Sequence, residues 1–160
     1  MNSLPTTPGP HIVDIATYAH ELFEIEKIVM SHSVYLYQFS SIEEFIQCLT
    51  VDHHCTIYIW NNDVGDTVGF FVHCDVPGER ESDELLLIVV LPTFQGQGYG
   101  GKMMDYYLGL LKDKKKSIIF THEKNTSAIS FYESLGYVFV KKVANKYVDG
   151  QTRVLMEKRL

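Results

Sequence analysis

Residues 95–102 read Gln95-Gly96-Gln97-Gly98-Tyr99-Gly100-Gly101-Lys102 and separate an apolar run from an amphipathic one. Before them, residues 84–91 are almost wholly apolar, which is typical of a strand covered on both faces at the centre of a sheet. After them, apolar side chains recur at helical spacing at Met104, Tyr107, Leu108 and Leu111. The glycines leave little side-chain bulk, and a helix start offers free N–H groups with a partial positive charge. The segment therefore predicts a phosphate or pyrophosphate site, with a purely structural glycine turn as the alternative.

The rest of the chain predicts a mixed order of strands and helices around this segment. Turn residues and β-formers predict strands at residues 11–15, 55–60, 67–72, 84–91 and 117–120, and a closing hairpin of residues 137–146 and 153–158. Apolar periodicity and caps predict helices at residues 17–30, 42–49, 98–112 and 125–135. We therefore expect one α/β domain, with a mixed central sheet of about seven strands flanked by about four helices.

Composition excludes several classes of protein. The 160 residues favour one domain, and the proline-containing residues 1–10 predict a flexible leader before a domain at 11–160. The net charge of −6 argues against a nucleic-acid partner, and no apolar run is long enough for a membrane helix. Three cysteines fit no disulfide framework, and without a secretion signal we expect a cytoplasmic protein. No metal is predicted, because His53-His54-Cys55 and His73-Cys74 lack a standard ligand spacing.

Two familiar phosphate loops fit residues 95–102 poorly. A Walker loop would use Gly96 and Gly101-Lys102, but Met103 stands where the Mg²⁺-binding hydroxyl is required. A dinucleotide fingerprint also matches the glycines in spelling, but Thr121-His122 follow the next strand in place of an acidic residue. Neither loop therefore explains the segment.

Two motifs together resemble the GNAT superfamily of N-acetyltransferases. Gln95-x-x-Gly98-x-Gly100 is similar to that family's acetyl-CoA pyrophosphate loop. Downstream, the chain follows the family's second motif with Asn125-x-x-Ala128-x-x-Phe131-Tyr132-x-x-Leu135-Gly136-Tyr137. The resemblance covers residues 11–159, and the order and separation of the motifs make it specific. It implies the GNAT fold, in which two central parallel strands, here residues 84–91 and 117–121, splay apart around the substrate.

The resemblance also implies roles for particular residues. Acetyl-CoA would be contacted by the backbone of the central strand, by the glycine segment and by the second motif, at Ile88, Val89, Val90, Gln95, Gly96, Gln97, Gly98, Tyr99, Gly100, Gly101 and Asn125. Asn125 is equally suited to cap a helix. Tyr132 occupies the position of the acid that protonates the leaving thiolate, with core packing as its alternative. Glu84 resembles a general base but is equally readable as a surface carboxylate, and His122 is the second candidate base.

The acceptor implied by the resemblance is a primary amine, either a small amine or a peptide or protein amine. The ending Asn145-Lys146-Tyr147-Val148-Asp149-Gly150 with Met156 is similar to that of protein N-terminal acetyltransferases, although the spacing before Asn125 is shorter than theirs. Tyr35, Tyr37 and Phe39 stand where the family builds its acceptor wall, or else belong to the core. A CoA-binding regulatory module without turnover and a nucleotide-binding domain are the alternative functions. The oligomeric state, monomer or homodimer, stays open.

Overall fold

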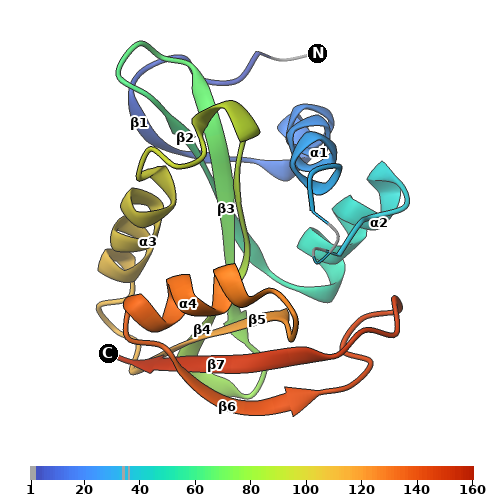
Figure 1. Cartoon of the computed structure of the whole chain (residues 1–160). Coiled ribbons are helices and arrows are strands. Elements are labelled where there is room, and N and C mark those ends of the chain that lie inside the picture. The colour runs from blue at the N-terminus through green and yellow to red at the C-terminus, as the bar shows by residue number, and fades with distance from the viewer. Residues whose placement is uncertain (1–2, 34, 36) are drawn as a thin grey trace.

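The computed structural model describes residues 3–33, 35 and 37–160, and it shows a seven-stranded sheet with helices on both faces (Figure 1). The strands lie in the order β1-β2-β3-β4-β5-β7-β6. Their bounds are β1 (Gly9–Val13), β2 (Cys55–Asn61), β3 (Thr67–Val76), β4 (Glu79–Val90), β5 (Lys116–His122), β6 (Val138–Val143) and β7 (Arg153–Arg159). The helices are α1 (Ile15–Met30), α2 (Ile42–Gln47), α3 (Tyr99–Leu110) and α4 (Thr126–Ser134). The predicted order of elements and the central position of β4 are confirmed.

Several element boundaries differ from the predicted ones. Pro77-Gly78 alone form the turn between β3 and β4, with Gly78 at a φ of 78°, so β4 begins at Glu79 and not at residue 84. A π-helical turn, Cys48–Asp52, extends α2. The first strand begins at Gly9, inside the predicted leader. The Asn61 side chain donates hydrogen bonds to the carbonyls of Pro5 at 2.7 Å and Thr7 at 2.9 Å. Residues 1–2 of the predicted leader lie outside the described residues.

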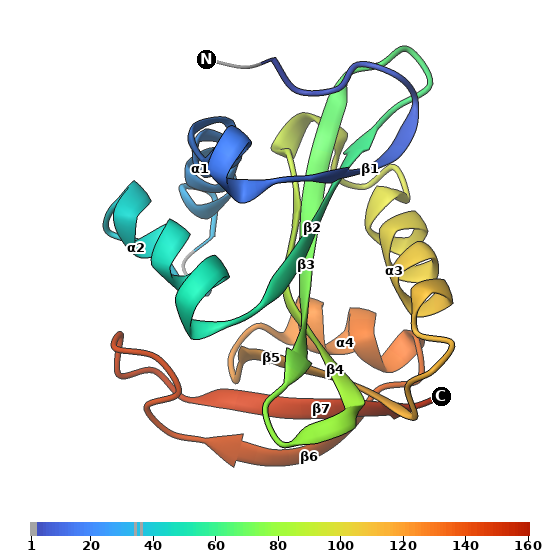
Figure 2. The ribbon, with the colours of Figure 1, turned by 180° about the vertical axis from the view of Figure 1, so that it is seen from behind.

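Each face of the sheet has its own apolar core, and Figures 1 and 2 show the helices that cover each face. On one face α1 and α2 bury Leu22, Phe45 and their neighbours against β2, β3 and β4. On the other, α3 and α4 pack with Met103, Met104 and Tyr107 against β3, β5 and β7. Apolar residues recur every three to four positions along the helices, so they share the face turned towards the sheet. Burial of each such side chain stabilises the fold by about 1.5–3 kcal/mol.

The two central parallel strands pair only at one end. β4 and β5 are in register at Ser82–Lys116, Asp83–Ser117 and Glu84–Ile118, and the pairing stops there. A β-bulge at Leu86 interrupts the register of β4 with β3 at the same level, because Val72 pairs with Leu87 and His73 with Leu85. A bulge bends its strand and increases the local twist, so β4 turns away from β5. The predicted splayed strands are therefore confirmed.

A buried network of hydroxyl and carboxylate groups fixes the paired end of these strands. The Tyr107 hydroxyl donates to Asp83 of β4 at 2.9 Å and lies 2.9 Å from the hydroxyl of Ser117 of β5. Ser117 in turn lies 2.6 Å from the Tyr137 hydroxyl, and His73 contacts the Asp83 carboxylate at 3.0 Å. The network thus joins β3, β4, β5 and α3 at the point from which the sheet opens.

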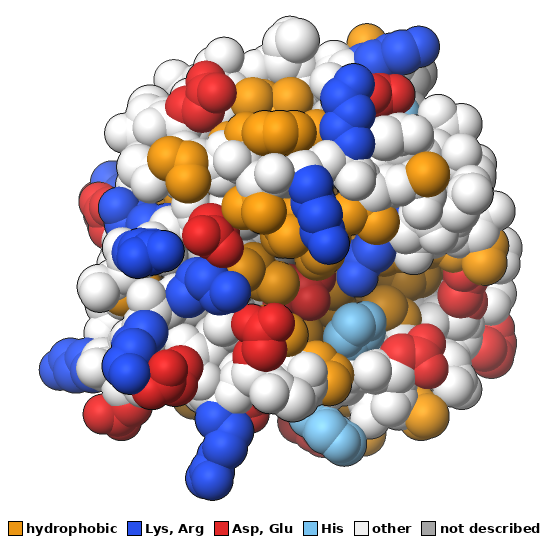
Figure 3. Space-filling model, turned by 90° about the horizontal axis from the view of Figure 1, so that it is seen from below, with side chains coloured by type: hydrophobic (Ala, Val, Ile, Leu, Met, Phe, Trp, Pro, Cys, Tyr) orange, Lys and Arg blue, Asp and Glu red, His pale blue; other side chains and the backbone are white. Residues whose placement is uncertain are grey.

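The β6 edge of the sheet is exposed and partly apolar. Val138, Phe139 and Val140 are exposed, and Lys141 and Lys142 follow them. Figure 3 views the molecule from this end and shows apolar side chains interspersed with basic and acidic ones. Lysines on an edge strand discourage pairing with another chain. Within the described residues, no helix combines the length and hydropathy that crossing a membrane requires.

Candidate active site

The glycine segment forms an open turn that leads into α3. Gly96 and Gly98 have φ values of 74° and 85°, which only glycine adopts without strain, and a Cβ built on either would meet nothing within 4 Å. Among the described residues, no protein group accepts a hydrogen bond from the N–H groups of residues 96–101. The first i→i−4 bond of the turn runs from Lys102 to Gly98. Six successive free donors at a helix N-terminus form an arrangement suited to a pyrophosphate.

The open edge of β4 offers further main-chain groups. The Leu91 N–H donates to the carbonyl of Val68 at 2.8 Å, so Leu91 and, by alternation, Val89 direct their main chain to β3. The main-chain groups of Ile88 and Val90 therefore face the splayed gap. The Gln95 side chain donates to the carbonyl of Val90 at 2.9 Å. Gln95 thus anchors the glycine segment to β4.

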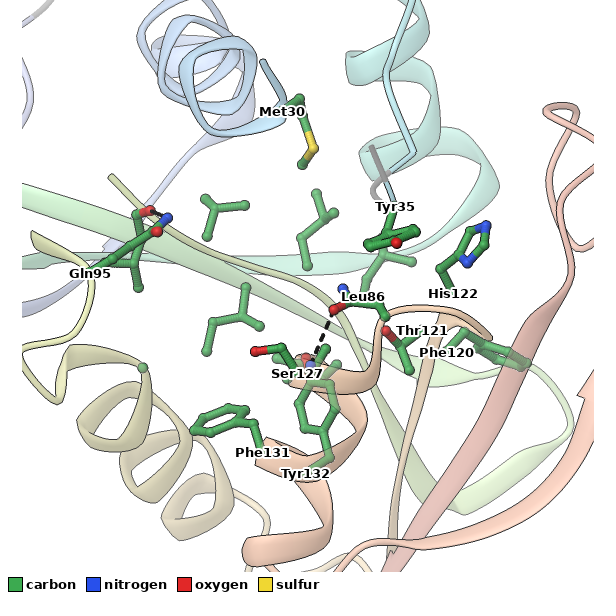
Figure 4. A pocket seen from close by; sticks show the side chains of 18 of the residues that line it. Met30, Tyr35, Leu86, Gln95, Phe120, Thr121, His122, Ser127, Phe131 and Tyr132 are labelled. Carbon is green, nitrogen blue, oxygen red and sulfur yellow. Dashed lines mark hydrogen bonds between the residues drawn. The ribbon is translucent and has the colours of Figure 1, made fainter. Parts of the chain in front are cut away.

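A cavity of about 650 Å³ runs through the gap between β4 and β5. Figure 4 shows Phe131 and Tyr132 of α4 on one side of it and Met30 and Tyr35 on the other. Most residues predicted to contact the cofactor line this main cavity, namely Ile88, Val89, Val90, Gln95, Gly96, Gly98, Tyr99, Gly100, Gly101 and Asn125. Gln97 does not line it, because its amide donates to the carbonyl of Thr93 at 3.1 Å.

Tyr132 and Asn125 reach the main cavity from α4. The Asn125 side-chain oxygen accepts from the Ala128 N–H at 3.2 Å, so the capping role is confirmed. Its amide nitrogen donates to no other described group. The Tyr132 ring packs edge-on against Tyr137 at 5.8 Å, and its hydroxyl bonds to no described residue. Burial, followed by the negative charge of an ionised Tyr137, raises the pKa of Tyr132, so it stays protonated.

His122 lines the same cavity but has no free lone pair. The Lys124 N–H donates to Nδ1 of His122 at 3.0 Å, so this nitrogen must be the acceptor. In a neutral ring the proton then sits on Nε2, which faces the side-chain oxygen of Gln151 at 3.3 Å. Tyr35 covers the ring at a centroid distance of 5.1 Å (Figure 4). As arranged here, both ring nitrogens of His122 are engaged in hydrogen bonds.

Glu84 lies apart from the cavity that the other predicted residues share. It sits at the last paired position of β4 and β5, is only 5% exposed, and is not among the residues that line the main cavity. Burial raises the pKa of its carboxyl, while nearby Lys146 opposes the shift. Its role as a base stays a prediction, but the surface-carboxylate alternative does not fit its burial.

A second cavity, of about 580 Å³, adjoins the first on the α2 side of the sheet. Tyr37, Leu86, Leu87 and Tyr147 line both cavities. Beyond them the second cavity is lined by α2, the turn after it, and the loop between β6 and β7, including Phe39, Glu44, Cys48, Asp52, His53 and Lys146. The two cavities therefore meet at a wall of aromatic and leucine side chains.

Hydrogen bonds and stacking hold this aromatic wall in place. The Tyr37 hydroxyl donates to Glu44, and burial together with this hydrogen bond raises the pKa of Tyr37 to about 12. Tyr37 packs on Tyr147 at a centroid distance of 5.2 Å. The Arg153 guanidinium lies 5.1 Å from the Tyr147 ring and pairs with Asp149 at 2.6 Å. The loop between β6 and β7 is thus fastened beside the main cavity.

Sequence reasoning missed several residues of the main cavity. Met30, Phe120, Thr121, Ser127 and Arg153 line it. Arg153 carried a usable signal, because Asp149 four residues earlier offers a partner that allows an arginine to be buried. The others are brought in by the register of β5 and by the ends of α1 and α4, which local sequence does not specify.

Comparison with known proteins decides the family. The model of the acetyltransferase (GNAT) family matches residues 19–137, which is more than half of the chain. The chain belongs to the GNAT acetyltransferase family. It is therefore an acetyl-CoA-dependent N-acetyltransferase.

Solved structures of other GNAT proteins share the fold. An acetyltransferase from Thermus thermophilus matches with a TM-score of 0.76 at 18% identity, covering 98% of this chain and 100% of that one. The ribosomal-protein-S18-alanine N-acetyltransferase from Escherichia coli matches at 0.71 and 20% identity, covering 94% and 92%. A mutant of the spermidine N-acetyltransferase SpeG from Vibrio cholerae matches at 0.72 and 14%, covering 94% of each chain. A sequence search of curated proteins found no match.

Proposed function

We propose that this enzyme acetylates primary amines of low pKa, above all the α-amine of a peptide or protein. One observation carries the proposal: the main cavity offers no free general base. None of its described lining residues is a carboxylate, and both ring nitrogens of His122 are engaged. An acceptor that is already partly neutral avoids the need for such a base.

The different pKa values of amines would make an enzyme without a base strongly prefer α-amines to lysine-like amines. An α-amine with a pKa of about 7.7–8.0 is roughly one-tenth neutral at pH 7. A lysine-like amine with a pKa of about 10.4 is neutral in less than about one molecule in a thousand. Without a base, the lysine-like amine presents a reactive lone pair about 250–500-fold more rarely.

The proposed transfer is direct. The neutral amine nitrogen attacks the thioester carbonyl carbon, and the carbonyl oxygen becomes an oxyanion next to the free main-chain donors of β4, at Ile88 and Val90. The carbon–sulfur bond then breaks with its electron pair on sulfur. Tyr132 donates a hydrogen bond to that sulfur. The raised pKa of Tyr132 argues against its giving the proton away, since a thiolate has a pKa of only about 8.5. The proton that sulfur gains comes instead from the attacking nitrogen.

The second cavity supports a peptide as the acceptor. It reaches the main cavity between Tyr37 and Tyr147, and its apolar lining of Phe39, Leu86 and Leu87 suits side chains next to a peptide N-terminus. The ending at residues 145–150, similar to that of N-terminal acetyltransferases, builds part of this cavity. The named structural neighbours act on a protein alanine and on spermidine, so they do not select the acceptor by themselves.

A matched acceptor panel tests the proposal. Release of free CoA thiol is followed with three acceptors: a short peptide with a free N-terminus and no lysine, the same peptide N-terminally blocked with one lysine added, and spermidine. We expect the first to be used with the highest kcat/KM at pH 7. Faster use of the blocked peptide or of spermidine would refute the preference for an α-amine. Acetyl-CoA binding with no thiol release from any acceptor would instead favour the alternative of a regulatory module.

A further inference from the structure

A row of metal-ligand side chains crosses three strands beneath the second cavity. Cys55 of β2 is the register partner of Cys74 of β3, and Cys74 is the partner of Glu84 of β4. Directly paired residues on neighbouring strands project to the same face of a sheet. His53 has an extended backbone two residues before Cys55, so its side chain projects to that face as well.

Three of these side chains converge on one point. One donor atom each from His53, Cys74 and Glu84 lie within 4.8 Å of one another, and Nδ1 of His53 is 3.9 Å from Sγ of Cys74. Cys74 is 2% exposed and Glu84 is 5% exposed. Glu84 also stands at the last paired position of β4 and β5, so the cluster lies directly at the point where the two strands part.

The donor types of the cluster suit a cation. A coordinating thiol loses its proton, so Cys74 and Glu84 would offer two negative donors beside the imidazole of His53.

We propose that His53, Cys74 and Glu84 bind one zinc ion. Imidazole nitrogen, thiolate sulfur and carboxylate oxygen are the three donor types that zinc accepts, whereas magnesium and calcium select oxygen alone. On binding, a zinc–sulfur bond forms as the Cys74 thiol releases its proton to solvent. The fourth tetrahedral position is taken by water from the second cavity, which His53 lines.

This site ties β2, β3 and β4 together beside the point where the sheet opens. It stabilises the wall of the second cavity and lies outside the main cavity, so it does not depend on the proposed acceptor. The sequence pattern did not predict a metal, because ligands spaced 21 and 10 residues apart match no standard motif. Strand register brings them together, and local spacing does not report that register.

Metal content and cobalt absorption test the proposal without measuring activity. Full-length protein is stripped with a chelator, reloaded with zinc and desalted, and bound zinc is counted by elemental analysis. In a parallel sample, Co²⁺ replaces zinc, and its thiolate charge-transfer band is recorded. We expect one zinc per chain, a cobalt band, and a higher Tm in the loaded protein than in the stripped protein.

Two cysteine variants locate the ion. Cys74→Ser is expected to lose both the bound zinc and the cobalt band, while its circular dichroism and acetyl-CoA binding show that it still folds. Cys55→Ser is the matched control, because Cys55 neighbours Cys74 but lies outside the group of three donors, and it should retain one zinc. The proposal is overturned if zinc does not bind stoichiometrically, or if both variants lose it equally. It is also overturned if the intact mass, lower by two hydrogens, shows a Cys55–Cys74 disulfide in untreated protein.

Discussion

Position 132 combines a polar hydroxyl with apolar surroundings at the edge of the main cavity. Because burial raises the pKa of Tyr132, the hydroxyl is a permanent hydrogen-bond donor at neutral pH. Under the proposed function it stabilises the departing sulfur. Tyr132→Phe should lower kcat about 10–100-fold, the value of one hydrogen bond to a charged group. The Kd for acetyl-CoA, measured by calorimetry, should stay within about twofold. A variant with unchanged kcat would show that Tyr132 serves only in packing.

The glycine at 98 is required by its backbone and by the open space in front of it. Gly98→Ala would place a Cβ in a left-handed conformation, which costs about 1–2 kcal/mol of stability, and would add a methyl group to the open space beside the turn. We expect acetyl-CoA affinity, measured by calorimetry, to fall at least about tenfold, because the methyl group would take space that the proposed pyrophosphate needs.

Gly109→Ala is the matched control for this substitution. Gly109 lies inside α3, and its added Cβ would meet no atom within 4 Å. The change should raise the free energy of unfolding by about 0.5–1 kcal/mol and leave acetyl-CoA binding unchanged. Equal loss of affinity in the two variants would contradict a local role for the glycine segment.

Within the site, residues of the two motifs were predictable, but the surroundings of the candidate bases were not. The glycine segment and Tyr132 could be predicted, because each belongs to a motif of fixed spacing. The hydrogen bonding of His122 could not be predicted, because its ring accepts from the Lys124 main chain only in the folded turn. Glu84 was placed correctly on its strand, but its burial follows from pairing with two neighbouring strands.

Among the elements, β4 and β5 depend on a small number of contacts. Tyr107 of α3 bonds to residues of both strands at their paired end. Tyr107→Phe leaves Asp83 and Ser117 each without one partner, which should lower the free energy of unfolding by about 1–3 kcal/mol in urea titration. Tyr106→Phe, at the next residue, removes a hydroxyl that bonds to no described group and is 36% exposed as a residue. Its effect should stay within about 0.5 kcal/mol, and an equal effect of both changes would argue against the network.

Helix α1 carries a carboxyl group that burial makes unfavourable. Glu26 is 1% exposed, and its Oε1 bonds to no described group. Burial, with the charge of Glu44, raises its pKa to about 7, although Lys27 opposes this. Because the folded pKa lies above the unfolded one, the folded state binds more protons, and stability falls as pH rises from about 4.5 to about 7.

Replacing this carboxyl removes the pH dependence it causes. Glu26→Gln should be more stable than the native chain by on the order of 1 kcal/mol or more at pH 8, with little difference at pH 4.5. Urea unfolding at the two pH values measures the difference. Glu43→Gln, at an exposed site of α2, should show no such change between them. A constant advantage of Glu26→Gln at both pH values would show that ionisation is not the cause.

Elements were more predictable than their ends. The Ser41 cap, which accepts from the Glu44 N–H at 3.1 Å, and the Asn125 cap are both local devices that the sequence pattern reveals. The extension of β4 to Glu79 is not local, because polar residues 79–84 are held in the sheet by β3 and β5. The bulge at Leu86 likewise has no sequence signal, although it explains why Leu86 and Leu87 pack on the same face.

At the scale of the whole molecule, the proposed function predicts that the ionisation of the acceptor amine determines how the reaction rate depends on pH. If no enzyme group acts as base, kcat/KM should rise with pH until the acceptor amine is neutral and then level off. Two free-N-terminus peptides whose α-amine pKa values differ by about one unit should give profiles displaced by about one pH unit. Initial rates of thiol release from pH 6 to pH 9.5 measure this. Profiles that coincide for both acceptors would assign the limiting ionisation to the enzyme and contradict the proposal.

The shared wall of the two cavities has a kinetic consequence. Under the proposed function, acetyl-CoA would lie along the glycine segment and the acceptor would enter from the α2 side, with Tyr37, Leu86, Leu87 and Tyr147 between them. Both molecules could then be bound at the same time, and no acetylated enzyme would have to form. Double-reciprocal plots of initial rate against acetyl-CoA concentration, at several acceptor concentrations, should then intersect, because the acetyl group passes directly from one bound substrate to the other.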